Sequence, residues 1–236
     1  PLDIVQQVGL VLEKMGIRKT QAQYLVMLVG LWLAIPGRVN YLNLERYGEL
    51  GERSHRGWFE KPVDFVGVNQ RVAEQALESW GSKDERQWIL GIDTSFVRKS
   101  GKATPNLGKY WDGKQGKAVK GLEVSCCSLI DLAWGQAFGL HMRSTQASET
   151  TNRTEQYAGH LHDVLGCLSP NLRQHIQYVV GDGYYAKQGF VTAVRQQDKH
   201  LVGKLRRNAD LRYPFTGPRS TGPGRPKLYE GKVDYQ

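Results

Sequence analysis

Residues 88–95 of the chain, Trp-Ile-Leu-Gly-Ile-Asp-Thr-Ser, form an apolar run that ends at Asp93. A second run, Ile-Gln-Tyr-Val-Val-Gly at 176–181, is followed in the same way by Asp182. A short apolar stretch bounded by turn residues predicts a buried strand, and sheet proteins commonly place their sites at the carboxyl ends of strands. If both strands lie in one sheet, the two carboxylates meet at one edge. Because ionised carboxylates repel unless a cation lies between them, the pair predicts a site for a magnesium-like ion.

The pattern around these two runs predicts a mixed α/β sheet covered by helices, preceded by a helical region. In the first 81 residues, apolar periodicity predicts helices at 2–15, 20–35, 43–50 and 68–80. The segment 52–59 between them combines arginines with Trp58 and Phe59, and we expect a loop there that either contacts DNA or buries its aromatic residues. Further strands are expected at 121–131, 135–143 and 200–205, and helices at 148–165 and 187–197.

The charge of the chain is strongly basic, with 32 Lys and Arg against 23 Asp and Glu, a net charge of +9. Two stretches hold most of the excess: residues 98–120 carry 7 − 1 = +6 and residues 199–236 carry 9 − 3 = +6. Basic surfaces of this kind favour polyanions such as nucleic acid, although solvated basic loops are the alternative interpretation. Both stretches flank the acidic strands, so we expect the basic surface to surround the metal site.

Several other classes of site are excluded by the sequence. The chain has no Gly-x-x-x-x-Gly-Lys-Ser/Thr loop and no Gly-x-Ser-x-Gly motif, so a P-loop and the commonest serine hydrolase signature are absent. Cys126, Cys127 and Cys167 have no disulfide-framework spacing, and His160 and His162 would diverge on a helix rather than chelate one ion. The apolar run 24–35 is too short to span a bilayer, and no signal peptide is visible.

Several motifs occur in an order and spacing that resemble the bacterial insertion-sequence DDE transposases, over about residues 88–232. The first group is Gly91-Ile92-Asp93-Thr94-Ser95-Phe96, Lys99-Ser100-Gly101-Lys102, Leu107-Gly108-Lys109-Tyr110-Trp111, Gly116-Lys117 and Lys120-Gly121-Leu122-Glu123. The second group is Val179-Val180-Gly181-Asp182-Gly183-Tyr184-Tyr185 and Gly224-Arg225-Pro226-Lys227-Leu228-Tyr229. The helical first part is similar to the amino-terminal DNA-binding region of these enzymes only in style.

The resemblance implies an RNase H-like core with a mixed five-stranded sheet, in which two aspartates and a glutamate bind two Mg²⁺ ions, with Mn²⁺ as a substitute. Asp93 matches the first aspartate and Asp182 the second. The glutamate of the family follows an inserted β segment, so we expect it beyond Gln236 and expect the chain to be carboxy-terminally truncated. Glu230 lies in a glycine-flanked stretch at the start of that insertion and lacks the rigid support that a ligand needs.

The resemblance also implies the domains and the partners. We expect a helical DNA-binding domain at 1–85, the catalytic core at 86–212, and the start of the inserted β segment at 213–236. The function implied is cleavage of mobile-element ends and strand transfer to target DNA, by a homodimer on double-stranded DNA in the bacterial cytoplasm, without a membrane. A non-catalytic DNA-binding remnant and an RNase H-type nuclease stay open as alternatives. The predicted phosphate contacts are Lys109, Lys117, Lys120, Arg206, Arg207 and Arg225.

Overall fold

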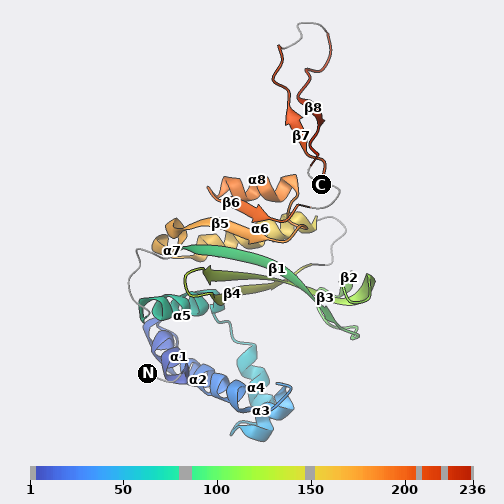
Figure 1. The fold of residues 1–236 in the computed structure, drawn as a ribbon. Coiled ribbons are helices and arrows are strands. Elements are labelled where there is room, and N and C mark those ends of the chain that lie inside the picture. Colours follow the sequence, from blue (N-terminus) through green and yellow to red (C-terminus); the bar gives the residue numbers. More distant parts are fainter. Residues whose placement is uncertain (1–3, 80–86, 147–151, 206–208, 219–222, 235–236) are drawn as a thin grey trace.

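The chain begins with five helices that share an apolar core. The computed structural model describes residues 4–79, 87–146, 152–205, 209–218 and 223–234. The helices are α1 (Ile4–Lys14), α2 (Lys19–Ala34), α3 (Tyr41–Tyr47), α4 (Glu52–Phe59) and α5 (Phe65–Ser79), which lie together at one end of the molecule (Figure 1). Leu12, Leu28 and Leu44 are buried where α1, α2 and α3 meet. The helices predicted from periodicity are therefore present, with shifted ends.

The prediction of a loop at 52–59 is wrong, because this segment forms the helix α4. Glu52 and Arg56 pair one turn apart on its exposed side, which supports a short helix. On the inner side, His55 is buried and its Nδ1 lies 3.1 Å from the Tyr24 hydroxyl. Trp58 stacks on the Tyr24 ring with 4.9 Å between centroids. Packing against α2 thus decides the helical form.

The fold class is confirmed as mixed α/β, but the main sheet has six strands rather than five. Its strands are β1 (Trp88–Arg98), β2 (Gly108–Asp112), β3 (Lys117–Asp131), β4 (Gln136–Ser144), β5 (Ile176–Gly181) and β6 (His200–Gly203). The order is β2-β3-β1-β5-β6, and β4 also pairs with β3. The extra strand β2 arises because β3 begins at Lys117, four residues earlier than predicted, and these first residues pair with β2.

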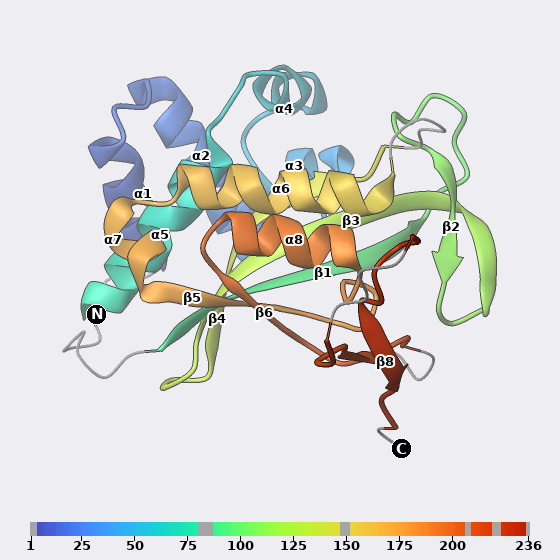
Figure 2. The same ribbon diagram turned by 90° about the horizontal axis from the view of Figure 1, so that it is seen from above.

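Two directions of pairing meet at β1. It runs antiparallel to β3 along its whole length and parallel to β5, and β5 is in turn parallel to β6. The helices α6 (Arg153–Cys167) and α8 (Gln188–Gln196) lie side by side over the sheet, as Figure 2 shows, and the short α7 (Pro170–His175) leads into β5. Leu90, Leu129, Leu161 and Phe190 are fully buried between these layers. The beginning of the helix predicted at 148–165 lies outside the described residues, and α6 starts at Arg153.

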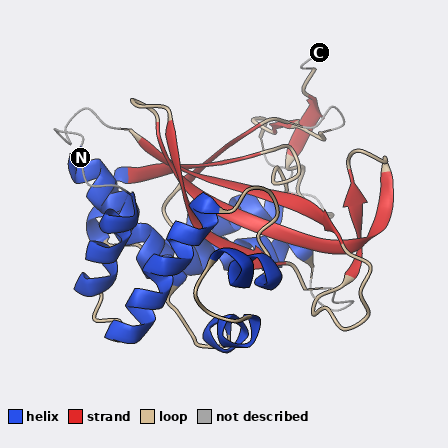
Figure 3. Cartoon of the chain, turned by 90° about the horizontal axis from the view of Figure 1, so that it is seen from below, coloured by secondary structure: helices blue, strands red, loops and turns tan. Residues whose placement is uncertain are grey.

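Helix α5 joins the helical region to the sheet. Val68 near its start packs in the helical core, and Ala73 one to two turns later is buried in the core of the sheet. The Asn69 amide donates to the Leu140 carbonyl of β4 at 2.9 Å, and Ser169 donates to Glu74 at 2.6 Å. In Figure 3 the strands form one layer with the first helices gathered at one end. The domain boundary at residue 85 stays a prediction.

A second, two-stranded sheet projects from the main sheet near the end of the chain (Figure 1). It consists of β7 (Arg212–Pro214) and β8 (Tyr229–Lys232), which pair antiparallel and are exposed on every residue. None of the described helices combines the length and the apolar character that crossing a bilayer requires.

Candidate active site

The parallel pairing of β1 with β5 brings the two predicted acids to one edge of the sheet. Gly91 of β1 lies opposite Val180 of β5, and this pair is the last in their ladder. Asp93 and Asp182 each follow two residues later, so they leave the ladder side by side. Both are exposed, Asp93 on the continuing strand β1 and Asp182 directly after β5. The register therefore places the two acids next to each other, beyond the last β1–β5 pair.

A buried tyrosine lies close to both acids. Gly181 makes room for it, because a Cβ there would come within 2.9 Å of Cδ2 of Tyr185. Burial raises the pKa of the Tyr185 hydroxyl, and the negative charges of Asp93 and Asp182 raise it further. The Thr94 hydroxyl is near enough to oppose that effect in part, yet no well-formed hydrogen bond to the Tyr185 oxygen exists within the described part of the chain. This phenol therefore stays protonated at neutral pH beside two carboxylates.

The turn after β5 orients the second carboxylate. The Asp182 Oδ1 accepts a hydrogen bond from the Tyr184 backbone N–H at 2.8 Å, and the Asp182 carbonyl accepts from Tyr185 N at 3.1 Å. One carboxylate oxygen is thus engaged by the backbone, which holds the group in place and leaves its other oxygen for a ligand. Carboxylate oxygens are suitable ligands for Mg²⁺ or Mn²⁺. Across the described ranges, no third His, Cys, Asp or Glu completes a metal-binding group.

Three of the predicted DNA contacts lie on one hairpin. Lys109 of β2 is paired directly with Lys120 of β3, Lys117 is paired with Asp112, and all three lysines are exposed. Like charges opposite each other destabilise a strand pair. A bound polyanion would therefore reduce the repulsion between Lys109 and Lys120 that is present in the free protein. Arg225 is exposed in the loop between β7 and β8, outside the main sheet. Arg206 and Arg207 lie outside the described residues.

The hairpin is attached to α6 through Tyr110. The hydroxyl of Tyr110 donates to the Thr145 carbonyl at 2.9 Å, and the ring lies under the Arg153 guanidinium, 4.9 Å from its centroid. Arg153 also donates to the Lys109 carbonyl at 3.3 Å. These contacts anchor β2 beside the start of α6, and they position Lys109 and Lys120 relative to the sheet edge.

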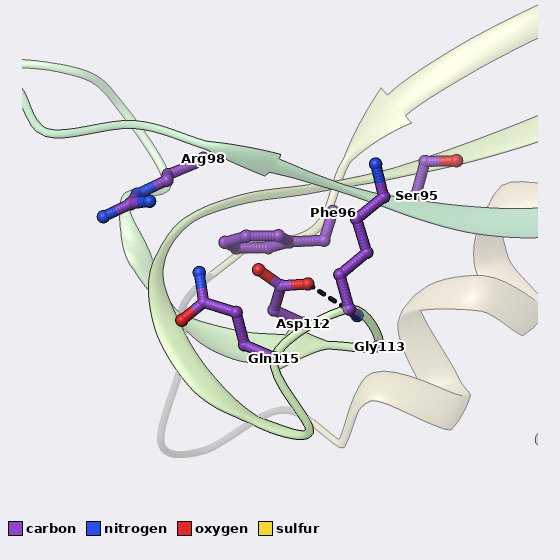
Figure 4. Close-up of a pocket in the computed structure, with 7 residues that line it drawn as sticks. Ser95, Phe96, Arg98, Asp112, Gly113 and Gln115 are labelled. Atoms are coloured by element: carbon purple, nitrogen blue, oxygen red, sulfur yellow. Dashed lines mark hydrogen bonds between the residues drawn. The ribbon is translucent and has the colours of Figure 1, made fainter.

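A cavity of about 570 Å³ lies between the last residues of β1 and the turn that joins β2 to β3. Ser95, Phe96 and Arg98 line it from β1, and residues 112–115 line it from the turn (Figure 4). Neither this cavity nor the role of Tyr185 follows from the sequence, because both depend on how distant segments pack. In the sequence, Phe96 and Tyr185 could be noticed only because they lie within the two aspartate motifs.

Several solved structures of nucleic-acid enzymes are similar to the chain, whereas no curated protein matches it. One is Ciona intestinalis endonuclease V bound to a 24mer DNA containing an inosine followed by a ribo-adenosine, with 14% identity, a TM-score of 0.30 and 57% of each chain covered. Another is the Mos1 mariner paired-end complex with Mn, with 12% identity, a TM-score of 0.30, and 84% of this chain and 54% of that chain covered.

A third similar structure is the Drosophila P element transposase strand transfer complex, with 12% identity, a TM-score of 0.30, and 84% of this chain and 47% of that chain covered. The chain thus spans only 47% to 57% of the length of these three structures. The family model described as DDE superfamily endonuclease matches residues 11–235 of the chain. That match includes both aspartates, the basic hairpin and nearly all of the chain, and the chain therefore belongs to the DDE superfamily of endonucleases.

Proposed function

We propose that the protein is a DNA transposase, which cuts the ends of its mobile element and joins them to target DNA. The observation that carries the proposal is the register of β1 and β5, which brings Asp93 and Asp182 to one sheet edge in a chain of the DDE endonuclease family. Paired carboxylates that hold divalent metal ions suit the cleavage and transfer of phosphodiesters. The exposed lysines of the β2–β3 hairpin add a basic surface on the same sheet.

The metal ions proposed are two Mg²⁺, for which Mn²⁺ would substitute, with Asp93 and Asp182 as ligands from this chain. When bound, such ions activate the attacking oxygen and stabilise the leaving oxygen of the phosphodiester. The turn after β5 keeps the Asp182 carboxylate oriented for them, and buried Tyr185 packs against Gly181, directly before that acid. A third carboxylate, which the family resemblance implies, stays a prediction.

The proposed partner is double-stranded DNA, both the terminal inverted repeats of the element and the target. Lys109, Lys117, Lys120 and Arg225 are proposed to contact phosphates, and so are Arg206 and Arg207. Such contacts position a duplex without reading its sequence. Because two element ends must be joined to one target, we propose a homodimer on DNA, acting at the nucleoid in the bacterial cytoplasm.

The proposal is tested with variants that remove one carboxylate and keep the size of the side chain. In protein that also contains the third carboxylate expected beyond Gln236, we expect Asp93→Asn and Asp182→Asn to abolish Mg²⁺- or Mn²⁺-dependent cleavage of plasmid DNA that carries the element ends, and to weaken Mn²⁺ binding measured by paramagnetic resonance. Removing a group that merely orients a metal ligand costs roughly 10- to 100-fold, so removing a ligand should cost at least that. Asp198→Asn is the matched control, because Asp198 is exposed and its φ of 57° suits asparagine.

The outcomes separate the alternatives. Cleavage and Mn²⁺ binding that persist in both Asp93→Asn and Asp182→Asn would contradict the site. Mn²⁺ binding that depends on both acids, without any cleavage, would indicate a DNA-binding remnant. Cleavage of RNA in an RNA–DNA hybrid, with no joining of element ends, would instead support a nuclease of the RNase H type.

A further inference from the structure

We propose that the cavity between the end of β1 and the β2–β3 turn binds one unstacked nucleotide of the DNA strand that passes Asp93. The proposal depends on the proposed function in one respect, namely that a DNA strand lies at Asp93. The cavity of about 570 Å³ lies within the size range of small-ligand sites, roughly 300–1,000 Å³, and is large enough for one nucleotide. Its lining combines an aromatic ring, hydrogen-bonding groups and two cations, which together match a base and its phosphate.

The aromatic wall is the ring of Phe96. Gly121, across the strand pair, lies so close that a Cβ there would be 2.5 Å from the Phe96 Cε2 atom and 2.5 Å from the Val97 carbonyl oxygen. The missing side chain lets the ring lie against the β3 backbone, which fixes its position. In Figure 4 the ring extends over Asp112, with Gln115 on the same side. A fixed and partly exposed ring is a stacking platform for any base.

The polar wall is the turn after β2, which its own hydrogen bonds hold in place. Asp112 is only 8% exposed, and its Oδ1 accepts from the Lys114 backbone N–H at 2.9 Å. Its carbonyl also accepts from Gly116 N at 2.9 Å and from Gln115 N at 3.2 Å. The second carboxylate oxygen of Asp112 and the Gln115 amide thus face the space in front of the ring (Figure 4). Acceptors of this kind suit the amino edge of a base.

The cations are Arg98 and Lys114, one from each side of the cavity. Within the described part of the chain neither forms an ion pair, so both charges are available to a phosphate. An arginine beside an aromatic face can also stack on a base. The chemistry therefore fits a nucleotide better than an uncharged ligand.

The place of the cavity connects it with the acids. Ser95 lines the cavity and follows Asp93 by two residues on β1, so the two side chains leave the same face of the strand. Phe96 follows Asp93 by three residues, about 10 Å along the strand at ~3.3 Å per residue, and its ring leaves the opposite face of β1, so the DNA strand would pass the edge of β1 beyond the end of its pairing with β5. A DNA strand rises ~3.4 Å per nucleotide, so the occupant lies within about three nucleotides of a phosphodiester at Asp93. A nucleotide taken out of the stack at this distance would hold the strand in register beside the metal ligands.

The test compares two short DNA duplexes in the absence of divalent metal. One carries a 2-aminopurine opposite an abasic site, and the other has the same sequence fully paired. We expect the protein to bind the first more tightly, and expect Phe96→Leu to reduce that preference roughly tenfold, as loss of one stacked base predicts. Phe96→Tyr, which keeps the ring, should retain the preference. Trp111→Leu is the matched control, because Trp111 is 62% exposed on the same hairpin and does not line the cavity.

Three results would overturn the proposal. These are an unchanged preference in Phe96→Leu, an equal loss in Trp111→Leu, or full competition by free deoxyadenosine monophosphate at the concentration of the duplex. The last would assign the cavity to a free nucleotide instead. If Phe96→Leu fails to fold, Gln115→Ala and Lys114→Gln alter exposed residues of the same cavity and should each lower the preference. If cleavage depends on Asp93 but the protein does not prefer the duplex with the abasic site, only the nucleotide site at the cavity is rejected. If the protein prefers that duplex but shows no cleavage that depends on Asp93, only the proposed cleavage is rejected.

Discussion

At the scale of single residues, His160 has an unusual environment for a group that titrates. It is fully buried on α6, with Nδ1 at 2.9 Å from the Ser125 hydroxyl and Nε2 at 3.0 Å from the Nδ1 of His141. Burial lowers the pKa of His160 to about 4, and the charges of Arg143 and His141 act in the same direction. Asp163 opposes them only in part. The imidazole is therefore a neutral member of a hydrogen-bonded core, whereas His162 is exposed.

This environment predicts acid-sensitive stability. The unfolded chain takes up a proton at His160 near pH 6.5, but the folded protein does so only near pH 4, so stability at neutral pH is lost progressively as the pH falls from about 6.5 to about 4. The difference corresponds to at most about 3 kcal/mol. Urea unfolding at several pH values measures it. His160→Gln should flatten this dependence, whereas His162→Gln should leave it unchanged, and an identical slope in both variants would contradict the interpretation.

At the scale of elements, a charged cluster attaches α6 to the sheet. Tyr157 of α6 donates a short hydrogen bond to the Glu123 carboxylate of β3, and Arg153 lies 3.5 Å from the other oxygen of that carboxylate. Burial and the neighbouring carboxylate both raise the pKa of Tyr157, so the phenol stays a donor. Glu123 thus has both of its oxygens engaged although it is almost fully buried.

The cluster predicts that removing the hydroxyl oxygen of Tyr157 lowers the stability of the fold. Tyr157→Phe removes the donor and leaves a buried carboxylate with Arg153 as its remaining partner. A hydrogen bond to a charged group contributes about 1.5–3 kcal/mol, so we expect the free energy of unfolding in urea to fall by that amount. Tyr213→Phe, on the exposed strand β7, is the control and should change stability by less than about 0.5 kcal/mol. Equal effects in both variants would show that the Glu123 contact contributes nothing.

Two elements show why sequence patterns alone were insufficient at this scale. The helix α4 is amphipathic, with polar residues on its outer side and Trp58 against Tyr24 on its inner side, but it is only eight residues long and contains few apolar residues. The strand β2 alternates exposed and buried residues over only five positions, and its pairing partner is the extension of β3. In both cases a distant segment stabilises a structure that the local residues favour only weakly.

At the scale of the whole molecule, the net charge of +9 is partly concentrated on one hairpin. Lys120→Gln removes one charge of the Lys109–Lys120 pair, so we expect weaker DNA binding with unchanged or higher stability. The slope of log K against log salt should fall by roughly 0.9, the value for one phosphate that the protein no longer neutralises. Titrations of a labelled duplex at several salt concentrations measure it. Arg195→Gln, an exposed position on α8, should not change the slope, and an equal change there would indicate a diffuse charge effect.

Most of the architecture could be predicted because its signals are local. Apolar runs that end in turn residues identified five of the six main strands, and both acids were visible at the ends of such runs, although only Asp182 follows the end of its strand, because β1 continues past Asp93 to Arg98. The motifs also identified the DDE family, which the family match confirms. Strand-end position follows from burial and chain direction, both of which short stretches of sequence encode.

The sequence by itself determined the strands, the acids and the basic excess of this protein, because each depends on neighbouring residues in the chain. Only the tertiary structure decided the parallel register that aligns Asp93 with Asp182, the burial of Tyr185 beside them, and the cavity at Phe96. Register and cavities depend on contacts between segments far apart in the chain. A pattern of local hydrophobicity contains no information about the distance between such segments, which packing in three dimensions sets.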